Sequence, residues 1–264
     1  MEATFVICLH TQRIDNLLQT IRFLIDDHLE VVENSALEVL FQDSYGDLNK
    51  NNYEELESLR EKFEKSCISS YELNQMRLPF LTNEGVKDAD TEKIIILESD
   101  RILAKGYFAK VLSELKPGVQ ITCQSIMKCT AAFSDEEIKN GNFTYKWDIR
   151  SKTNEIGRKN IWSGNTAICK SDYMRVGMMD EEYNGYGWAD SDMTKVTENA
   201  NIQSVFVSDP KFNEVHLWHP PLTYGVGDQK QLFIDNGLKF CKKWNVEMPD
   251  WFRKEIADHN RVIL

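Results

Sequence analysis

Hydrophobic and polar positions follow two alternating patterns over residues 1–118. Short apolar runs rich in β-branched residues predict buried strands, and these runs occupy residues 4–10, 36–47, 67–73 and 94–100. Apolar positions with helical spacing predict helices over residues 11–29, 53–66 and 103–115, and residues 81–93 predict a loop or a short helix. Strands that alternate with helices predict an α/β fold with a mainly parallel sheet.

The pattern changes after residue 118. Strand-like runs occur at 119–133, 161–170, 204–210 and 214–222, and the polar stretch 134–160 predicts a loop. A helix is expected after a cap at Ser171 or Asp172, another from about Ala189, and a single C-terminal helix over 229–244. No repeat or low-complexity linker separates the parts. We expect one compact domain of two abutting halves, 1–118 and 119–264.

Composition and charge narrow the possible partners. The chain has 264 residues, is 42% hydrophobic and carries a formal charge of -11, so it can bury a core and is repelled by nucleic acid and anionic membranes. None of the six cysteines forms a Cys-x-x-Cys pair, which favours free thiols in a reducing compartment. The N-terminus lacks the pattern of a signal peptide, and no stretch predicts a membrane span. We therefore expect a cytoplasmic protein.

Carboxylates follow two of the predicted strands. Glu98 and Asp100 are two residues apart at the end of the fourth strand and so share one side of an extended chain, and Asp43 follows the second strand. Ligands of open parallel sheets bind beyond the carboxyl ends of the strands. Mg²⁺ or Mn²⁺ takes carboxylate oxygens together with substrate phosphates, so Glu98 and Asp100 are candidate metal ligands. The alternative is a solvated strand end whose acids cap the next turn.

Four stretches, taken in order, resemble a GT-A-fold glycosyltransferase. They are "TFVICLHTQRIDNLLQTIRFL", "EVLFQDS", "LTNEGVKDADTEKIIILESDRILAKGYF" and "IWSGNTAICKSDYMRVGMMDEEYNGYGWADSDM". The first half is similar to the inverting family 2, and the second resembles the acceptor region of β-1,4-galactosyltransferases and chondroitin synthases. The resemblance covers about residues 4–222. It implies a mixed, mainly parallel sheet flanked by helices, and a metal-dependent inverting transfer of a sugar from a nucleotide-sugar, most simply a UDP-sugar, to a glycan or other hydroxyl.

The resemblance assigns donor and metal residues at the ends of the strands. The family carries an Asp-x-Asp (DXD) signature after its fourth strand, which implies that Glu98 contacts the donor ribose or the metal and that Asp100 coordinates Mn²⁺ or Mg²⁺. Asp43 matches the acid that holds the donor nucleoside. Thr11 and Arg13 match the loop that lines the nucleotide pocket.

One departure affects the diphosphate contacts. The family usually has Arg directly before the Asn of an Asn-x-Gly segment, whereas here Thr82 precedes Asn83 and Gly85. Asn83 remains a candidate donor contact by resemblance. Arg77, a few residues earlier, is the candidate to replace the missing arginine.

The segment "YNGYGWADSD" combines aromatic rings, glycines and acids. Tyr186 and Trp188 are candidates for an acceptor platform, since sugar C–H groups stack on aromatic faces. An ordinary core position is the competing interpretation for Trp188. By resemblance, Asp190 is the base that takes the proton of the acceptor hydroxyl, with Ala189 where the family usually has Glu. Asp192 is either a further acceptor contact or an acid favoured by the start of a helix, where the dipole lowers carboxyl pKa values.

Two histidines in "VHLWHPP" complete the set of candidate metal ligands. His216 and His219 are three residues apart, so on an extended strand they point to opposite faces and do not share an ion unless the chain turns. His219 best matches the family's metal-binding histidine, with His216 as the second choice.

Three other functions fit parts of the sequence. A non-catalytic carbohydrate-binding or accessory GT-A protein would keep the aromatic residues without needing all the acids. A viral-type DNA-base glycosyltransferase is disfavoured by the charge of -11. A nucleotidyltransferase would need a glycine-rich, basic loop after the first strand, and "LHTQRID" has none.

Overall fold

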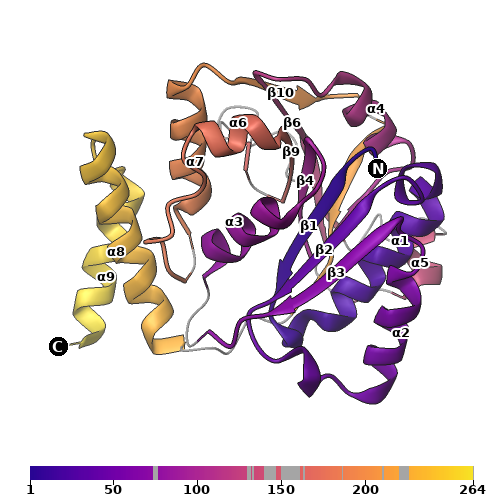
Figure 1. Cartoon of the computed structure of the whole chain (residues 1–264). Coiled ribbons are helices and arrows are strands. Elements are labelled where there is room, and N and C mark those ends of the chain that lie inside the picture. Colours follow the sequence, from indigo (N-terminus) through magenta and orange to yellow (C-terminus); the bar gives the residue numbers. More distant parts are fainter. Residues whose placement is uncertain are drawn as a thin grey trace.

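The computed structural model describes residues 1–73, 77–129, 132, 134–139, 147–149, 161–162, 164–185, 187–209, 211–219 and 226–263. The first part of the chain alternates strands and helices, as the sequence predicts (Figure 1). Its elements are β1 (Thr4–Leu9), the 3₁₀ turn η1 (Thr11–Arg13), α1 (Ile14–Val32), β2 (Ala36–Phe41), η2 (Tyr45–Asp47), α2 (Lys50–Arg60), β3 (Lys65–Ser70), α3 (Leu78–Asp88), β4 (Lys93–Glu98), β5 (Arg101–Leu103) and α4 (Tyr107–Glu114).

The second part adds strands to the same structure. Its elements are β6 (Val119–Cys123), β7 (Ser125–Cys129), α5 (Asp135–Lys139), β8 (Trp147–Ile149), β9 (Asn165–Cys169), α6 (Lys170–Arg175), α7 (Ala189–Asn199), β10 (Gln203–Val207), β11 (Asn213–His216), α8 (Val226–Trp244) and α9 (Asp250–Ile263). The central sheet has seven strands in the order β10-β6-β9-β4-β1-β2-β3, and a smaller sheet has the order β5-β11-β7-β8. The central sheet therefore runs without a break across residue 118.

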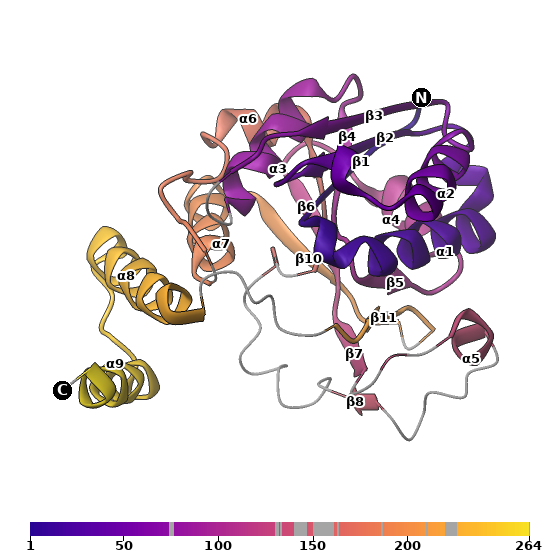
Figure 2. The same ribbon diagram turned by 90° about the horizontal axis from the view of Figure 1, so that it is seen from below.

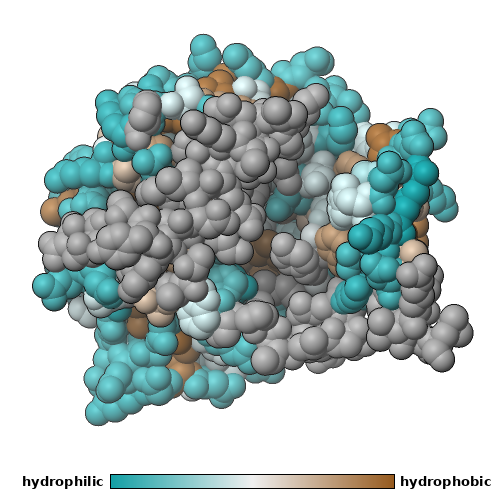
Figure 3. Space-filling view, turned by 180° about the vertical axis from the view of Figure 1, so that it is seen from behind, coloured by the Kyte–Doolittle hydropathy of each residue, from teal (hydrophilic) through white to brown (hydrophobic). Residues whose placement is uncertain are grey.

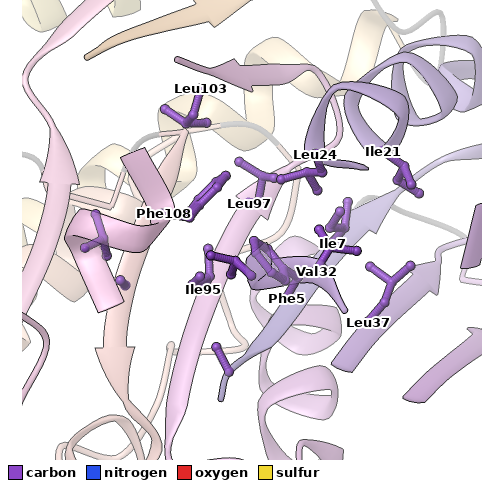
Figure 4. Packing of buried hydrophobic residues seen from close by; sticks show 14 of the residues in the cluster. Phe5, Ile7, Ile21, Leu24, Val32, Leu37, Ile95, Leu97, Leu103 and Phe108 are labelled. Carbon is purple, nitrogen blue, oxygen red and sulfur yellow. The ribbon is translucent and has the colours of Figure 1, made fainter. Parts of the chain in front are cut away.

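The central sheet is mainly parallel, with β9 antiparallel to both β4 and β6. Every residue of β1 and β2 is buried, which is typical of strands covered by helices on both faces. Side chains of a strand alternate between the faces: Phe5 and Ile7 enter the core beneath α1, α2 and α4 (Figure 4). Val6 and Cys8 enter the second core, beneath α3, α6 and α7.

Several elements differ from the sequence prediction. Leu103, where the predicted helix 103–115 begins, is instead the last residue of β5, which pairs with β11, and α4 starts later, at Tyr107. Of the two alternatives for 81–93, the helix is present, but α3 begins earlier, at Leu78, and ends at Asp88. The C-terminal part is a pair of helices, α8 and α9, that lie side by side next to α7 (Figures 1 and 2). The polar stretch 134–160 contains α5 and β8, and its other described residue is Ser134.

The surface agrees with the composition. Seen from behind, the described residues are mainly hydrophilic, and apolar ones are scattered among them (Figure 3). All six cysteines are free, as expected, and four of them are buried. Among the described residues no helix is both long and apolar enough to cross a membrane.

Gly85 offers a test of the packing between α3 and the sheet. A Cβ at this position would lie 2.5 Å from Val6 Cγ1 and 2.7 Å from Leu40 Cδ1. We expect Gly85→Ala to lower the free energy of unfolding by about 1–3 kcal/mol through overpacking, although alanine is the better helix former. Gly46→Ala, whose Cβ would meet its nearest atom at 3.5 Å, is the control. An unchanged urea midpoint for Gly85→Ala would contradict this packing.

Candidate active site

The carboxyl ends of β1, β2 and β4 meet at one edge of the sheet, because β1 pairs in parallel with both of the other strands. Thr11 and Arg13 follow β1, Asp43 follows β2, and Asp100 lies two residues beyond the end of β4. The structure thus brings the predicted donor and metal residues of three strands to the same edge.

The short strand β5 brings the two histidines to this edge. It pairs antiparallel with β11, with His216 opposite Arg101. Beyond the end of β11, the backbone N–H of Leu217 donates a hydrogen bond to the carbonyl oxygen of Asp100 at 2.8 Å. The chain therefore leaves the strand beside the turn that carries Asp100.

Both histidines converge on one carboxylate oxygen. Asp100 is 1% exposed, and its Oδ2 lies 3.2 Å from His219 Nε2 and 3.5 Å from His216 Nε2. One ligand atom from each of the three residues lies within 4.8 Å of the others. The opposite-face arrangement expected for an extended strand does not apply, because β11 ends at His216 and His219 lies beyond it. The alternative that the sequence left open, two histidines at one ion, is the one that the structure supports.

The surroundings favour an ionised Asp100 and a neutral His216. Burial opposes ionisation of Asp100, but the hydrogen bonds to both histidines and the charge of Arg101 outweigh it and hold the pKa well below its usual range. Burial lowers the pKa of His216, and Arg101 lowers it further, although Asp100 acts against both. A carboxylate and a neutral imidazole are the protonation states that bind a metal.

Arginines supply the nearest positive charges. Arg13 Nη1 lies 2.9 Å from Asp100 Oδ2, and Arg101 Nε lies 3.2 Å from Asp100 Oδ1. Arg101 Nε also donates to Glu98 Oε2 at 2.8 Å, and its Nη1 lies 3.1 Å from Glu214 Oε1. Glu98, predicted as a metal or ribose contact, is thus bound to Arg101 and lies outside the Asp100–His216–His219 cluster.

Arg101 and Glu214 are site residues that the sequence reasoning missed. Both side chains are buried, and Glu214 also accepts a hydrogen bond from Asn165. Gly164 leaves room for the pair, because a Cβ there would lie 2.4 Å from Glu214 Oε1. The available signal was a charged residue directly before each of two short apolar stretches, Arg101 before "IL" and Glu214 in the strand-like run "EVHL".

Asp43 and Thr11 contact one another. Asp43 accepts a hydrogen bond from the backbone N–H of Thr11 at 2.9 Å and a second from the Thr11 hydroxyl. Asp43 is only partly buried. It therefore fixes the loop after β1 and keeps a surface that a ligand can reach.

The structure gives Asn83 a structural role. Its amide nitrogen donates to Met179 O and Glu181 Oε1, both at 2.9 Å, and its oxygen accepts from Tyr173 Oη at 2.6 Å and Met179 N at 3.1 Å. These four bonds use the full capacity of the amide. Arg77, the other candidate in this region, stacks on Phe80, with 4.9 Å from the guanidinium carbon to the ring centroid.

Asp190 lies in the first turn of α7. Burial and the negative charge of Glu98 raise its pKa to about 7, against a smaller opposing effect of Arg101. The Asp190 pKa is therefore raised, whereas the dipole of α7 alone would lower it. Desolvation of the carboxyl group outweighs the effect of the dipole. An acid poised near pH 7 suits general base catalysis.

The other predicted acceptor residues have different surroundings. Trp188 packs against rings of α8 and α9, with 5.2 Å to the Phe240 centroid and 4.9 Å to that of Phe252. The oxygens of Asp192 accept hydrogen bonds from Lys243 Nζ and Trp244 Nε1. Tyr186 lies outside the described residues.

Asp100, His216 and His219 fit a divalent metal by their chemistry. They offer one carboxylate oxygen and two imidazole nitrogens. Asp100 Oδ1 is buried and accepts no hydrogen bond, although Arg101 Nε lies 3.2 Å from it. Mg²⁺ prefers oxygen ligands, whereas first-row transition ions accept imidazole as well. The donor set therefore suits Mn²⁺ better than Mg²⁺.

Comparison with known proteins gives structural matches only. No family model and no curated protein matches the chain. The structure is similar to GalNAc-T7 with UDP, GalNAc and Mn²⁺ (TM-score 0.61, 12% identity, 98% of this chain and 54% of that chain). It is also similar to TarS of S. aureus, with a TM-score of 0.60 and 12% identity over 98% of this chain and 43% of that chain. A third similar structure is the mannosyltransferase PcManGT of Pyrobaculum calidifontis with GDP-Man and Mn²⁺, with a TM-score of 0.54 and 12% identity over 98% of this chain and 69% of that chain.

These likenesses extend over nearly the whole chain. Each of the three matches covers 98% of the chain and so includes both halves. The resemblance of the two halves to two different glycosyltransferase families stays a prediction. The chain spans about half the length of the first two structures it matches. The seven-stranded, mainly parallel sheet and these matches together show that the chain has the GT-A fold.

Proposed function

We propose that this protein is a metal-dependent glycosyltransferase that moves a hexosyl or related sugar from a nucleotide-sugar to an acceptor hydroxyl. The observation that carries the proposal is the convergence of Asp100, His216 and His219 at the sheet edge where ligands of such folds bind. A UDP-sugar is the favoured donor, since UDP accompanies Mn²⁺ in the GalNAc-T7 structure.

Asp100, His216 and His219 would hold the metal, with Mn²⁺ preferred. When bound, the ion would stabilise the negative charge that develops on the leaving diphosphate. Arg13, which reaches Asp100 from the loop after β1, would bind a diphosphate oxygen. The protein needs such positive groups because its overall charge of -11 repels an anionic donor.

The donor nucleoside would bind over the loop that Thr11 and Asp43 hold together. Both lie at the ends of strands in residues 1–118, whereas Asp190 comes from residues 119–264. We therefore retain the division into a donor-binding half and an acceptor-binding, catalytic half. Within the second half, Trp188 and Asp192 would act mainly through packing, because their side chains already have partners on α8 and α9.

Asp190 would act as the general base of an inverting transfer. Its carboxylate takes the proton of the acceptor hydroxyl, the acceptor oxygen forms a bond to the anomeric carbon, and the bond from that carbon to the diphosphate breaks. The carboxyl pKa of about 7 supports this role, because a base of that pKa is ionised at physiological pH and still accepts a proton readily.

The proposal is tested by incubating the protein with Mn²⁺ and a panel of UDP-sugars and measuring the release of UDP. Release above that of Asp190→Asn with at least one donor supports it. Metal-dependent UDP binding without any such release would instead favour a non-catalytic accessory protein. Binding of duplex DNA at low salt would favour a DNA-base glycosyltransferase.

Substitutions in the cluster test the metal site. We expect Asp100→Asn to weaken Mn²⁺ binding in the presence of UDP by at least about tenfold, and His219→Gln to act in the same direction, since each removes one ligand. Asp209→Asn makes the same carboxylate-to-amide change at a partly exposed residue beyond β10 and should leave the affinity unchanged. Isothermal titration gives the Kd, and equal affinities for Asp100→Asn and Asp209→Asn would exclude Asp100 as a ligand.

The pKa of Asp190 predicts a pH profile. A base works only when deprotonated, so kcat/KM should fall about tenfold per pH unit below pH 7 and level off above it. Glu98→Gln should move this limb to lower pH, because the Glu98 charge helps to raise the Asp190 pKa. Asp190→Asn should lower kcat by about a hundredfold or more. If Glu98→Gln leaves the fall of kcat/KM at the same pH, a group other than Asp190 is responsible for it.

A further inference from the structure

Helix α8 contacts residues 180–185 and 187–192, which we call the 180–192 segment and which carry Asp190 near their C-terminal end. Asn236 of α8 is buried, and its amide nitrogen donates hydrogen bonds to two backbone carbonyls of the segment, Asn184 O at 2.7 Å and Gly187 O at 3.3 Å. One side chain of the helix thus fixes the backbone just before α7.

An ion pair between the buried Asp192 and Lys243, whose side chain is 34% exposed, makes a second connection. Asp192 is 1% exposed and lies in the same first helical turn as Asp190. Lys243 Nζ donates to its Oδ2 at 2.8 Å, and Trp244 Nε1 donates to its Oδ1 at 2.7 Å. Lys243 also lies 3.0 Å from Asp180 Oδ2, at the other end of the segment.

Close packing leaves little freedom between the two elements. A Cβ on Gly187 would lie 2.6 Å from Phe233 Cδ2 of α8, and one on Gly185 would lie 2.9 Å from Leu232 Cδ1. Both glycines have positive φ, of 86° and 71° respectively, so a side chain would be strained there as well as blocked. The segment lies directly against α8.

Trp188 shows that the segment is held in a costly conformation. Its φ of 71° is rare for a bulky side chain and costs on the order of 1–3 kcal/mol unless the surroundings enforce it. Its ring is enclosed by Phe240 of α8 and by Trp251 and Phe252 of α9, and Trp251 is stacked on it at 11° and 5.8 Å. Contacts from the C-terminal helices therefore enforce the turn into α7.

We propose that α8 positions Asp190: Asn236 and Lys243 hold the 180–192 segment, and with it the first turn of α7 that carries the carboxylate. This inference rests on the proposed function, since it assigns positioning residues to the proposed base. The hydrogen bonds of both side chains end on the 180–192 segment and not on the Asp100–His216–His219 cluster. Losing these hydrogen bonds should misplace the Asp190 carboxylate and leave the binding of the metal and the nucleotide unchanged.

The test uses Asn236→Leu and Lys243→Met in the full chain. We expect each to lower kcat about ten- to a hundredfold, because a misplacement of about 1 Å is enough for such a loss, while the Kd for UDP with Mn²⁺ stays within about twofold. Lys243→Arg keeps the charge and should retain most of the activity. Lys242→Met changes the neighbouring, exposed lysine and serves as the matched control.

Two further measurements keep the test decisive. If Lys243→Met fails to fold because Asp192 is left buried without its charged partner, the double variant Asp192→Asn/Lys243→Met removes both charges and takes its place. Hydrogen exchange at the amide of Asp192, which donates to Trp188 O at 2.8 Å, reports on the segment without any turnover. Faster exchange in Asn236→Leu and Lys243→Met, but not in Lys242→Met, is expected.

The outcomes separate this inference from the proposed function. Unchanged kcat and unchanged exchange in both variants would overturn the positioning role, and so would an equal loss of kcat and of UDP affinity. If the wild-type protein transfers no sugar but the variants still exchange faster at Asp192, the proposed function fails and the structural role of α8 stands.

Discussion

The buried negative charge of Asp100 is the constraint on which the rest of the site depends. Removing a carboxylate from water costs several kcal/mol unless partners compensate for it, and Asp100 is 1% exposed. Its partners come from three regions of the chain: Arg13 from the loop after β1, Arg101 from β5, and the two histidines from the end of β11. The smaller sheet is what brings β5 and β11 together, so its pairing and the site depend on each other.

Arg101 allows several acids to share this small volume. Glu98, Asp100 and Glu214 all lie within ion-pair distance of its guanidinium, and like charges at such separations repel strongly without a cation between them. Two carboxyl groups in this region have pKa values that are shifted in opposite directions. Asp100 is held ionised, whereas Asp190 has its pKa raised to about 7, and such separation is typical of sites that divide binding and proton transfer between two acids.

The sequence was sufficient for the parts that depend on local pattern. The strand–helix alternation, the edge formed by Asp43 and Asp100, and the start of α7 at Ala189 could be predicted, because burial periodicity and strand polarity determine them. The pairing of β5 with β11 could not, since β5 has three residues and no periodicity to recognise. For that reason the sequence could name His216 and His219 only as alternative ligands, and left their convergence conditional on a turn in the chain. Trp188 and Asp192 were taken as acceptor residues because their partners lie some 50 residues later, on helices whose docking no local pattern reveals.

The central claim is that Asp100, His216 and His219 jointly hold a divalent ion against the diphosphate of a nucleotide. Diffraction from crystals grown with UDP and Mn²⁺, recorded at the manganese absorption edge, tests it most directly. The account predicts one strong anomalous peak within about 2.5 Å of an Asp100 oxygen and of Nε2 of both histidines, next to the diphosphate. A nucleotide bound with no such peak, or with manganese held by other residues, would contradict it.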